Sequence, residues 1–184
     1  IRNGTATIEK IRPHEVDAKD SRIRVTWSGA EYRGRGRQTN WVGTAQFEGC
    51  TVDRLEMINA WNPERPLELT DSSTVTFDAI TTGNFGGFDV WLQGGESGNL
   101  VLDTNQGELK VELDQIDSEG VVMDAGGLQR RLSARRLPAR MSVRELEQEV
   151  EVSLDGSRDN PLWICVTTED GFQAWSSPIF VIAP

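Results

Sequence analysis

The sequence is poor in the residues that most often carry out catalysis or bind metal ions. Its 184 residues include one histidine, His14, and two cysteines, Cys50 and Cys165. This pattern does not supply the clustered ligands of a zinc site. A serine–histidine–carboxylate triad would have to use His14, and the sequence lacks the Gly-x-Ser-x-Gly turn that presents a nucleophile. A glycine-rich phosphate loop and a dinucleotide fingerprint are missing too. We therefore expect this chain to have no catalytic residue, no bound metal and no cofactor, and not to be an enzyme by itself.

Long apolar runs and an excess of positive charge are also missing. No stretch approaches the ~20 apolar residues that cross a bilayer as a helix. The sequence has 29 acidic residues against 19 lysines and arginines, which gives a formal net charge of −10. Such an excess of negative charge disfavours binding to nucleic acid and to anionic membranes. We expect neither of them as a partner.

The low cysteine count excludes a disulfide framework, and a chain of this length does not need one to fold. A domain of comparable size buries roughly 70% of the surface that its unfolded chain exposes. Cys50 and Cys165 both lie in strand-like runs, so we expect two buried thiols, with one disulfide between them as the alternative.

Carboxylates are abundant, but they form no recognisable metal-binding motif. Residues 155–160 place oxygen ligands at alternate positions, as a calcium loop of a β-sandwich would. Arg158 lies among these ligands, however, and no bidentate glutamate follows at the spacing of an EF-hand. A plain turn is therefore the better interpretation.

What the sequence does contain is a series of short alternating runs separated by glycine, proline and asparagine turns. Such runs predict strands at 5–11, 22–27, 41–47, 50–60, 73–81, 87–93, 99–104, 108–114, 121–124 and 128–137. Successive short strands with tight turns are typical of all-β folds. We therefore predict a single domain spanning residues 1–184, an antiparallel β-sandwich (jelly-roll-like as one variant) with at most one short helix.

The only helix that we predict lies at 141–151. Val143, Leu146 and Val150 recur there at helical spacing. Val152 and Leu154 continue an alternating, strand-like pattern from Val150, so the helix is expected to be short.

The last strands are predicted to form a hairpin over 160–182. Apolar and polar residues alternate from Leu162 onward, and Asp170-Gly171 is a tight-turn dipeptide. The final residues, 179–182, are continuously apolar, which is typical of a strand covered on both sides. We therefore expect this hairpin to complete the hydrophobic core.

Arginine and tryptophan provide the candidate binding residues. Arg33, Arg35 and Arg37 lie on a glycine-rich loop next to Trp41, a combination that can grip an anion and stack on a ring. The alternative, which we favour, is that these arginines pair with surface carboxylates while Trp41 enters the core. Trp61, beside Asn62-Pro63, is the best candidate for an exposed, sugar-stacking tryptophan. We expect four others to be core residues, since they lie within predicted strands: Trp27, Trp91, Trp163 and Trp175.

The C-terminal motifs resemble a known family. Asn160-Pro161, Asp170-Gly171 and the run Ala174-Trp175-Ser176-Ser177-Pro178-Ile179 are similar to the end of large bacterial proteins related to the PHP (polymerase and histidinol phosphatase) metal-dependent hydrolases. Residues 30–41 and 81–83 are similar to that region less specifically. The resemblance implies a β-rich region that follows a metal-binding α/β barrel. It transfers no catalytic residue, because the family's metal ligands lie in the barrel.

The resemblance, together with a sequence that begins at Ile1 without methionine, leads us to expect a C-terminal fragment of a larger protein. Its expected role is that of a non-catalytic accessory domain, which packs against the catalytic domain of the same polypeptide or mediates homo-oligomer formation. Arg33, Arg35 or Arg37 would then reach towards an anionic substrate. The alternative is a carbohydrate-binding module that uses Trp61 and Trp41.

Overall fold

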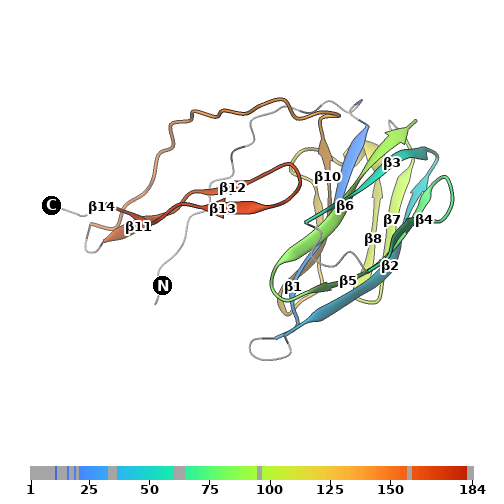
Figure 1. Ribbon diagram of the computed structural model, residues 1–184, viewed down its shortest axis with the longest axis horizontal. Helices are drawn as coiled ribbons and strands as arrows, with labels where there is room; N and C mark the ends of the chain where they lie inside the picture. Colours follow the sequence, from blue (N-terminus) through green and yellow to red (C-terminus); the bar gives the residue numbers. More distant parts are fainter. Residues whose placement is uncertain are drawn as a thin grey trace.

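Two five-stranded antiparallel sheets pack face to face in the computed structural model, which confirms the predicted all-β sandwich (Figure 1). The structure describes residues 11, 16, 19, 21–32, 37–59, 65–94, 97–156 and 159–181. Sheet A has the order β3 (Thr51–Ile58), β6 (Phe85–Gln93), β1 (Arg22–Ala30), β10 (Leu128–Leu137) and β9 (Val121–Asp124). Sheet B has the order β4 (Leu67–Leu69), β5 (Thr74–Thr81), β2 (Thr39–Glu48), β7 (Asn99–Thr104) and β8 (Gly107–Glu112).

The chain crosses repeatedly between the two sheets, so the central strand of each has neighbours from distant parts of the sequence. β1 pairs with β6 on one side and β10 on the other, and β2 pairs with β5 and β7. This connectivity is typical of Greek-key sandwiches. The alternating runs predicted from residue 22 to residue 137 correspond to these strands apart from β4, which was not predicted, and 128–137 is a strand as predicted. The predicted strand at 5–11 and His14 fall outside the described residues, apart from Ile11.

The hydrophobic core lies between the two sheets. Ile23, Val25 and Trp27 point inward from β1, and the Trp27 ring stacks on Phe77 of β5 at a centroid distance of 4.5 Å. Trp41 is also fully buried; its indole N–H donates to the Thr81 hydroxyl over 2.8 Å. These inner faces fill the space between the sheets without any contribution from the C-terminal hairpin.

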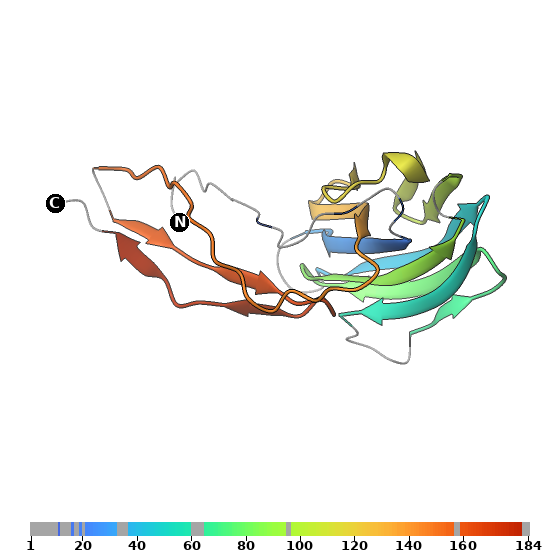
Figure 2. The same cartoon turned by 90° about the horizontal axis from the view of Figure 1, so that it is seen from above.

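The chain leaves the sandwich after β10 and forms an arm, defined here as residues 141–181 (Figures 1 and 2). The predicted helix at 141–151 is wrong, because residues 141–155 form neither helix nor strand and are drawn as a long coil in Figures 1 and 2. A helix would place Glu145 against Glu149 and Glu147 against Glu151, and like charges four residues apart destabilise helices. Among the described residues the only helical element is a single 3-10 turn, η1 (Leu113–Gln115). None of the described residues form a helix long and apolar enough to cross a bilayer.

The rest of the arm is the predicted hairpin. It contains two short ladders, β11 (Asn160–Leu162) with β14 (Ile179–Val181) and β12 (Cys165–Thr167) with β13 (Gln173–Trp175). At the start of the hairpin, the Asn160 side-chain amide accepts a hydrogen bond from the Asp155 backbone N–H and donates one to the Asp155 carbonyl, as in a simple turn.

The prediction that this hairpin completes the core is wrong. Ile179 and Phe180 are more than half exposed, because the hairpin projects away from a core that is already filled. Of the four tryptophans expected in the core because they lie in predicted strands, only Trp27 is there: Trp163 and Trp175 are exposed, and Trp91 is half-buried on the outer face of sheet A.

The two cysteines have different environments. Cys50 is buried, as expected, and burial raises the pKa of its thiol. Cys165 lies on β12 of the arm and is exposed, contrary to the expectation. Both are free thiols, so no disulfide joins them.

Candidate functional site

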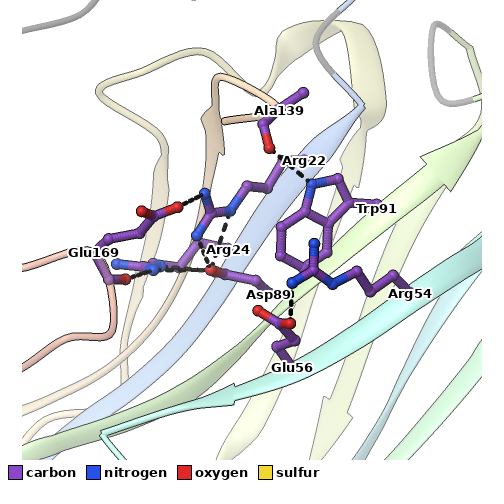
Figure 3. Close-up of polar contacts among 8 residues, drawn as sticks. All are labelled: Arg22, Arg24, Arg54, Glu56, Asp89, Trp91, Ala139 and Glu169. Atoms are coloured by element: carbon purple, nitrogen blue, oxygen red, sulfur yellow. Dashed lines mark hydrogen bonds and ion pairs between the residues drawn. The ribbon is translucent and has the colours of Figure 1, made fainter. Parts of the chain in front are cut away.

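Buried charges gather on the outer face of sheet A, at the point where the arm touches it (Figure 3). Alternate residues of β1 point into the core, so Arg22 and Arg24 point to the opposite face. Their side chains are only 2% and 3% exposed. We call Arg22, Arg24, Asp89 and Glu169 the arginine cluster.

Asp89 joins the two arginines. It lies on β6 directly opposite Arg24 and is 1% exposed. Arg24 donates to both of its carboxylate oxygens, from Nε to Oδ1 over 2.7 Å and from Nη2 to Oδ2 over 2.8 Å. Arg22 donates to Oδ2 from Nε over 3.1 Å and from Nη2 over 2.5 Å. Charge-assisted, forked contacts of this kind are the strong ones in proteins.

The tip of the arm supplies the remaining acceptors. Glu169 accepts a hydrogen bond from Arg22 Nη1 through its carboxylate, and its backbone carbonyl accepts one from Arg24 Nη2. Next to it, the backbone carbonyl of Asp170 accepts from the Asn59 backbone N–H over 2.8 Å. Gly171 (φ 89°) packs against Asn59 and Phe85, where a Cβ atom would lie 3.3 Å from the Asn59 Cβ. The tip is thus held by charge and backbone contacts, with little apolar packing.

Trp91 forms one border of the cluster. Its ring lies between two guanidinium groups, with Arg22 at 4.7 Å and Arg54 at 4.2 Å from the ring centroid. The indole N–H donates over 3.0 Å to the carbonyl of Ala139, where the chain leaves β10 for the arm. Arg54 also pairs with Glu56. Trp91 therefore ties the start of the arm to the same face of sheet A that binds its tip.

The charges of the cluster balance only when the tip is bound. Two guanidinium groups face one buried carboxylate, and Glu169 supplies the second negative charge. Burial alone would lower the pKa of Arg22, but the hydrogen bonds and charges of Asp89 and Glu169 outweigh it, and the pKa is raised. An arginine that stays charged is suited to binding a carboxylate and unsuited to proton transfer. The cluster is thus a binding site for an acidic turn.

The residues predicted as a site from the sequence are not brought together here. Arg33, Arg35 and Trp61 lie outside the described residues, and Arg37 is exposed before β2. Trp41 is in the core, as the favoured interpretation expects, so its ring has no face available to a ligand. The sequence did not lead us to predict the arginine cluster. A signal was present, because Arg22 and Arg24 alternate with apolar residues in a strand of the core.

A small cavity of about 60 Å³ lies between β3, β5 and β6 of the sandwich. Trp27, Phe77 and Phe85 line it together with Asn59 and Arg65. Ligand pockets usually measure about 300–1,000 Å³, so this cavity is too small for a sugar ring. No metal-binding group of histidine, cysteine, aspartate or glutamate side chains was found in the described part of the chain.

Comparison with known proteins found no matching family model, curated protein or solved structure. The functional argument therefore rests on the residues of this chain.

Proposed function

We propose that this chain is a non-catalytic accessory β-sandwich domain of a larger, PHP-like metal-dependent hydrolase. In this proposal the arm packs on the catalytic domain of the same polypeptide, with homo-oligomer formation as the other use of the same surface. The resemblance of the hairpin motifs suggests the family, and the exposed side chains of the arm give the physical reason to expect a packing partner.

The observation that carries the proposal is the exposure of the aromatic side chains of the arm. Trp163, Phe172, Trp175 and Phe180 are 45%, 53%, 66% and 56% exposed. Large exposed apolar patches usually mark interaction surfaces. A two-stranded ribbon is marginally stable in water, so the arm needs a partner to bury these rings.

The carbohydrate-binding alternative receives less support. It relied on Trp41 and Trp61, and the Trp41 ring is enclosed in the core. Trp61 alone would offer one stacking surface, whereas the arm presents four exposed aromatic rings.

The coding sequence upstream of Ile1 is the first test. Histidine- and aspartate-rich metal motifs there would support the proposal, and a start codon immediately before Ile1 would contradict it. In the complete polypeptide, backbone amides of residues 160–181 should exchange with deuterium more slowly than in the 184-residue chain. Equal exchange in both proteins would show that the arm does not pack on the rest of the polypeptide.

A further inference from the structure

Residues 145–154 have the sequence pattern of a strand but no strand partner. Their side chains alternate between two chemical classes along this segment. Odd positions carry Glu145, Glu147, Glu149 and Glu151 followed by Ser153, and even positions carry Leu146, Val150, Val152 and Leu154, interrupted by Gln148. In an extended chain, alternate residues lie on the same face. As a strand, the segment would therefore present one acidic face and one largely apolar face.

Both faces are available for binding. Residues 145–154 belong to no helix or strand and pair with no strand of the described structure, whereas the backbone N–H and carbonyl of Asp155 are already bonded to the Asn160 side chain. Leu146, Val150, Val152 and Leu154 are 43–53% exposed. The four glutamates are exposed too, and none has an ion-pair partner among residues 21–32, 37–59, 65–94, 97–156 and 159–181. Figure 1 shows the segment running outward from the sandwich, apart from both sheets.

The same segment of a second copy is an unsuitable partner. Residues that face each other across paired strands lie on the same face of the sheet. In one register, self-pairing would set glutamate against glutamate, which is destabilising. A shift by one residue would set glutamate against valine or leucine and mix the two faces. Neither register places a positive charge opposite the glutamates.

The sheet edges of a second copy are unsuitable as well. The four edge strands of the sandwich are β3, β9, β4 and β8, and each exposes more carboxylates than basic groups, while the strands of the arm, β11 to β14, carry no lysine or arginine. The exposed carboxylates on them are Asp53, Glu56, Glu68, Glu108, Glu112 and Asp124. An acidic strand would meet like charge at an edge of the sandwich and no basic group at an edge of the arm, so the complementary edge belongs to a different folded unit.

We propose that residues 145–154 add as a strand to a basic sheet edge. The partner edge presents lysine or arginine opposite the glutamate face and apolar side chains opposite Leu146, Val150, Val152 and Leu154. This inference rests on the proposed function, which places that edge on the catalytic domain of the same polypeptide. Strand addition supplies backbone hydrogen bonds to the segment, and the alternating side chains supply the specificity.

The test uses the 184-residue chain and a labelled synthetic peptide in which lysine and valine alternate. A peptide of the same composition in blocked order serves as the control for charge alone. Binding is measured by fluorescence anisotropy at low and at raised ionic strength. The protein variants are Glu145→Gln/Glu147→Gln/Glu149→Gln/Glu151→Gln and a matched control, Glu31→Gln/Glu68→Gln/Asp103→Asn/Glu108→Gln, which removes the same number of exposed charges from the sandwich.

The alternating peptide should bind the native chain, and the arm variant should weaken binding by about tenfold or more, since several opposite-charge cross-strand pairs are lost. The control variant and the native chain should bind alike, and the blocked peptide should bind weakly. No binding, equal loss in both variants or equal binding of both peptides would each overturn the inference. Concentration-dependent dimerisation that disappears in the arm variant would overturn it too, because the occupant would then be a second copy.

The two proposals can fail separately. A hydrolase domain encoded upstream, combined with no peptide binding, would leave the proposed function intact and remove the strand-addition inference. Specific peptide binding without such a domain would retain the basic edge as the ligand class and remove the assignment to a hydrolase.

Discussion

Arg24 and Asp89 face each other across the neighbouring strands β1 and β6, and two hydrogen bonds join their side chains in a fork. The pair lies on the outer face of sheet A, yet both side chains are nearly inaccessible to water. A charge in such a place is stable only while its partner is present.

Replacing Asp89 by Leu should therefore strongly destabilise the sandwich. The change leaves Arg22 and Arg24 buried without their shared carboxylate, and we expect a loss of about 3–5 kcal/mol in the free energy of unfolding. Urea denaturation followed by tryptophan fluorescence measures this loss. The triple variant Arg22→Met/Arg24→Met/Asp89→Leu removes all three charges and should recover most of it. A single variant as stable as the native chain would show that the buried pair is not needed.

Replacing Glu169 by Gln should release the tip of the arm while leaving the sandwich folded. Its carboxylate is 47% exposed, so the expected change in global stability is less than about 1 kcal/mol. The Asn59 amide, which donates to the Asp170 carbonyl, should exchange faster with deuterium because the tip detaches more often. Glu108→Gln, on edge strand β8, is the matched control and should leave the Asn59 amide unchanged. Equal exchange in both variants would mean that Glu169 does not hold the tip.

The turn at the tip should loosen at low pH. The pKa of the Asp170 carboxyl is lowered, chiefly because the Thr168 hydroxyl donates a hydrogen bond to it. Desolvation acts in the opposite direction. The Phe172 backbone amide and the charge of Arg24 lower the pKa further. A carboxyl group with a lowered pKa stabilises the folded turn above about pH 3.9, and this contribution is lost as the pH falls through the lowered value. NMR titration of the Thr168 and Phe172 amides would follow the change. Asp170→Asn should remove that step, and an unchanged titration in this variant would refute the assignment.

The thiols should differ in reactivity. Cys165 is exposed on the arm, whereas Cys50 is buried and its pKa is raised. A thiol-specific reagent should label only Cys165 in the native chain and both cysteines after denaturation. Cys165→Ser should leave the native chain unlabelled. Labelling of Cys50 at the same rate as Cys165 would contradict its burial.

Nine of the ten strands of the sandwich were predictable because they show a local alternation of apolar and polar residues; β4, with only three residues, is too short to show one. The structure of 141–155 was not, since Val143, Leu146 and Val150 fit helical spacing while Val150, Val152 and Leu154 fit a strand. The repulsion between glutamates four residues apart, visible in the sequence, disfavours the helix. The hairpin was predictable from Asp170-Gly171, but its pattern does not reveal whether a core or a partner covers it.

The arginine cluster depends on register between distant strands, which the sequence does not reveal. Arg24 and Asp89 are 65 positions apart and meet because β1 and β6 pair in one register. Each residue alone looks like a surface charge, and only the pairing turns them into a buried fork.

The central place of β1 in sheet A also affects how the chain folds. The partners of its side chains lie far along the sequence. Arg24 bonds to Asp89, and the Thr26 hydroxyl lies 2.6 Å from the hydroxyl of Ser133, a residue 107 positions further on. Closing such long loops before any pairing is gained slows folding, and sandwiches of this kind fold over roughly milliseconds to seconds. During synthesis β1 therefore cannot complete its pairing in sheet A until β10 has left the ribosome.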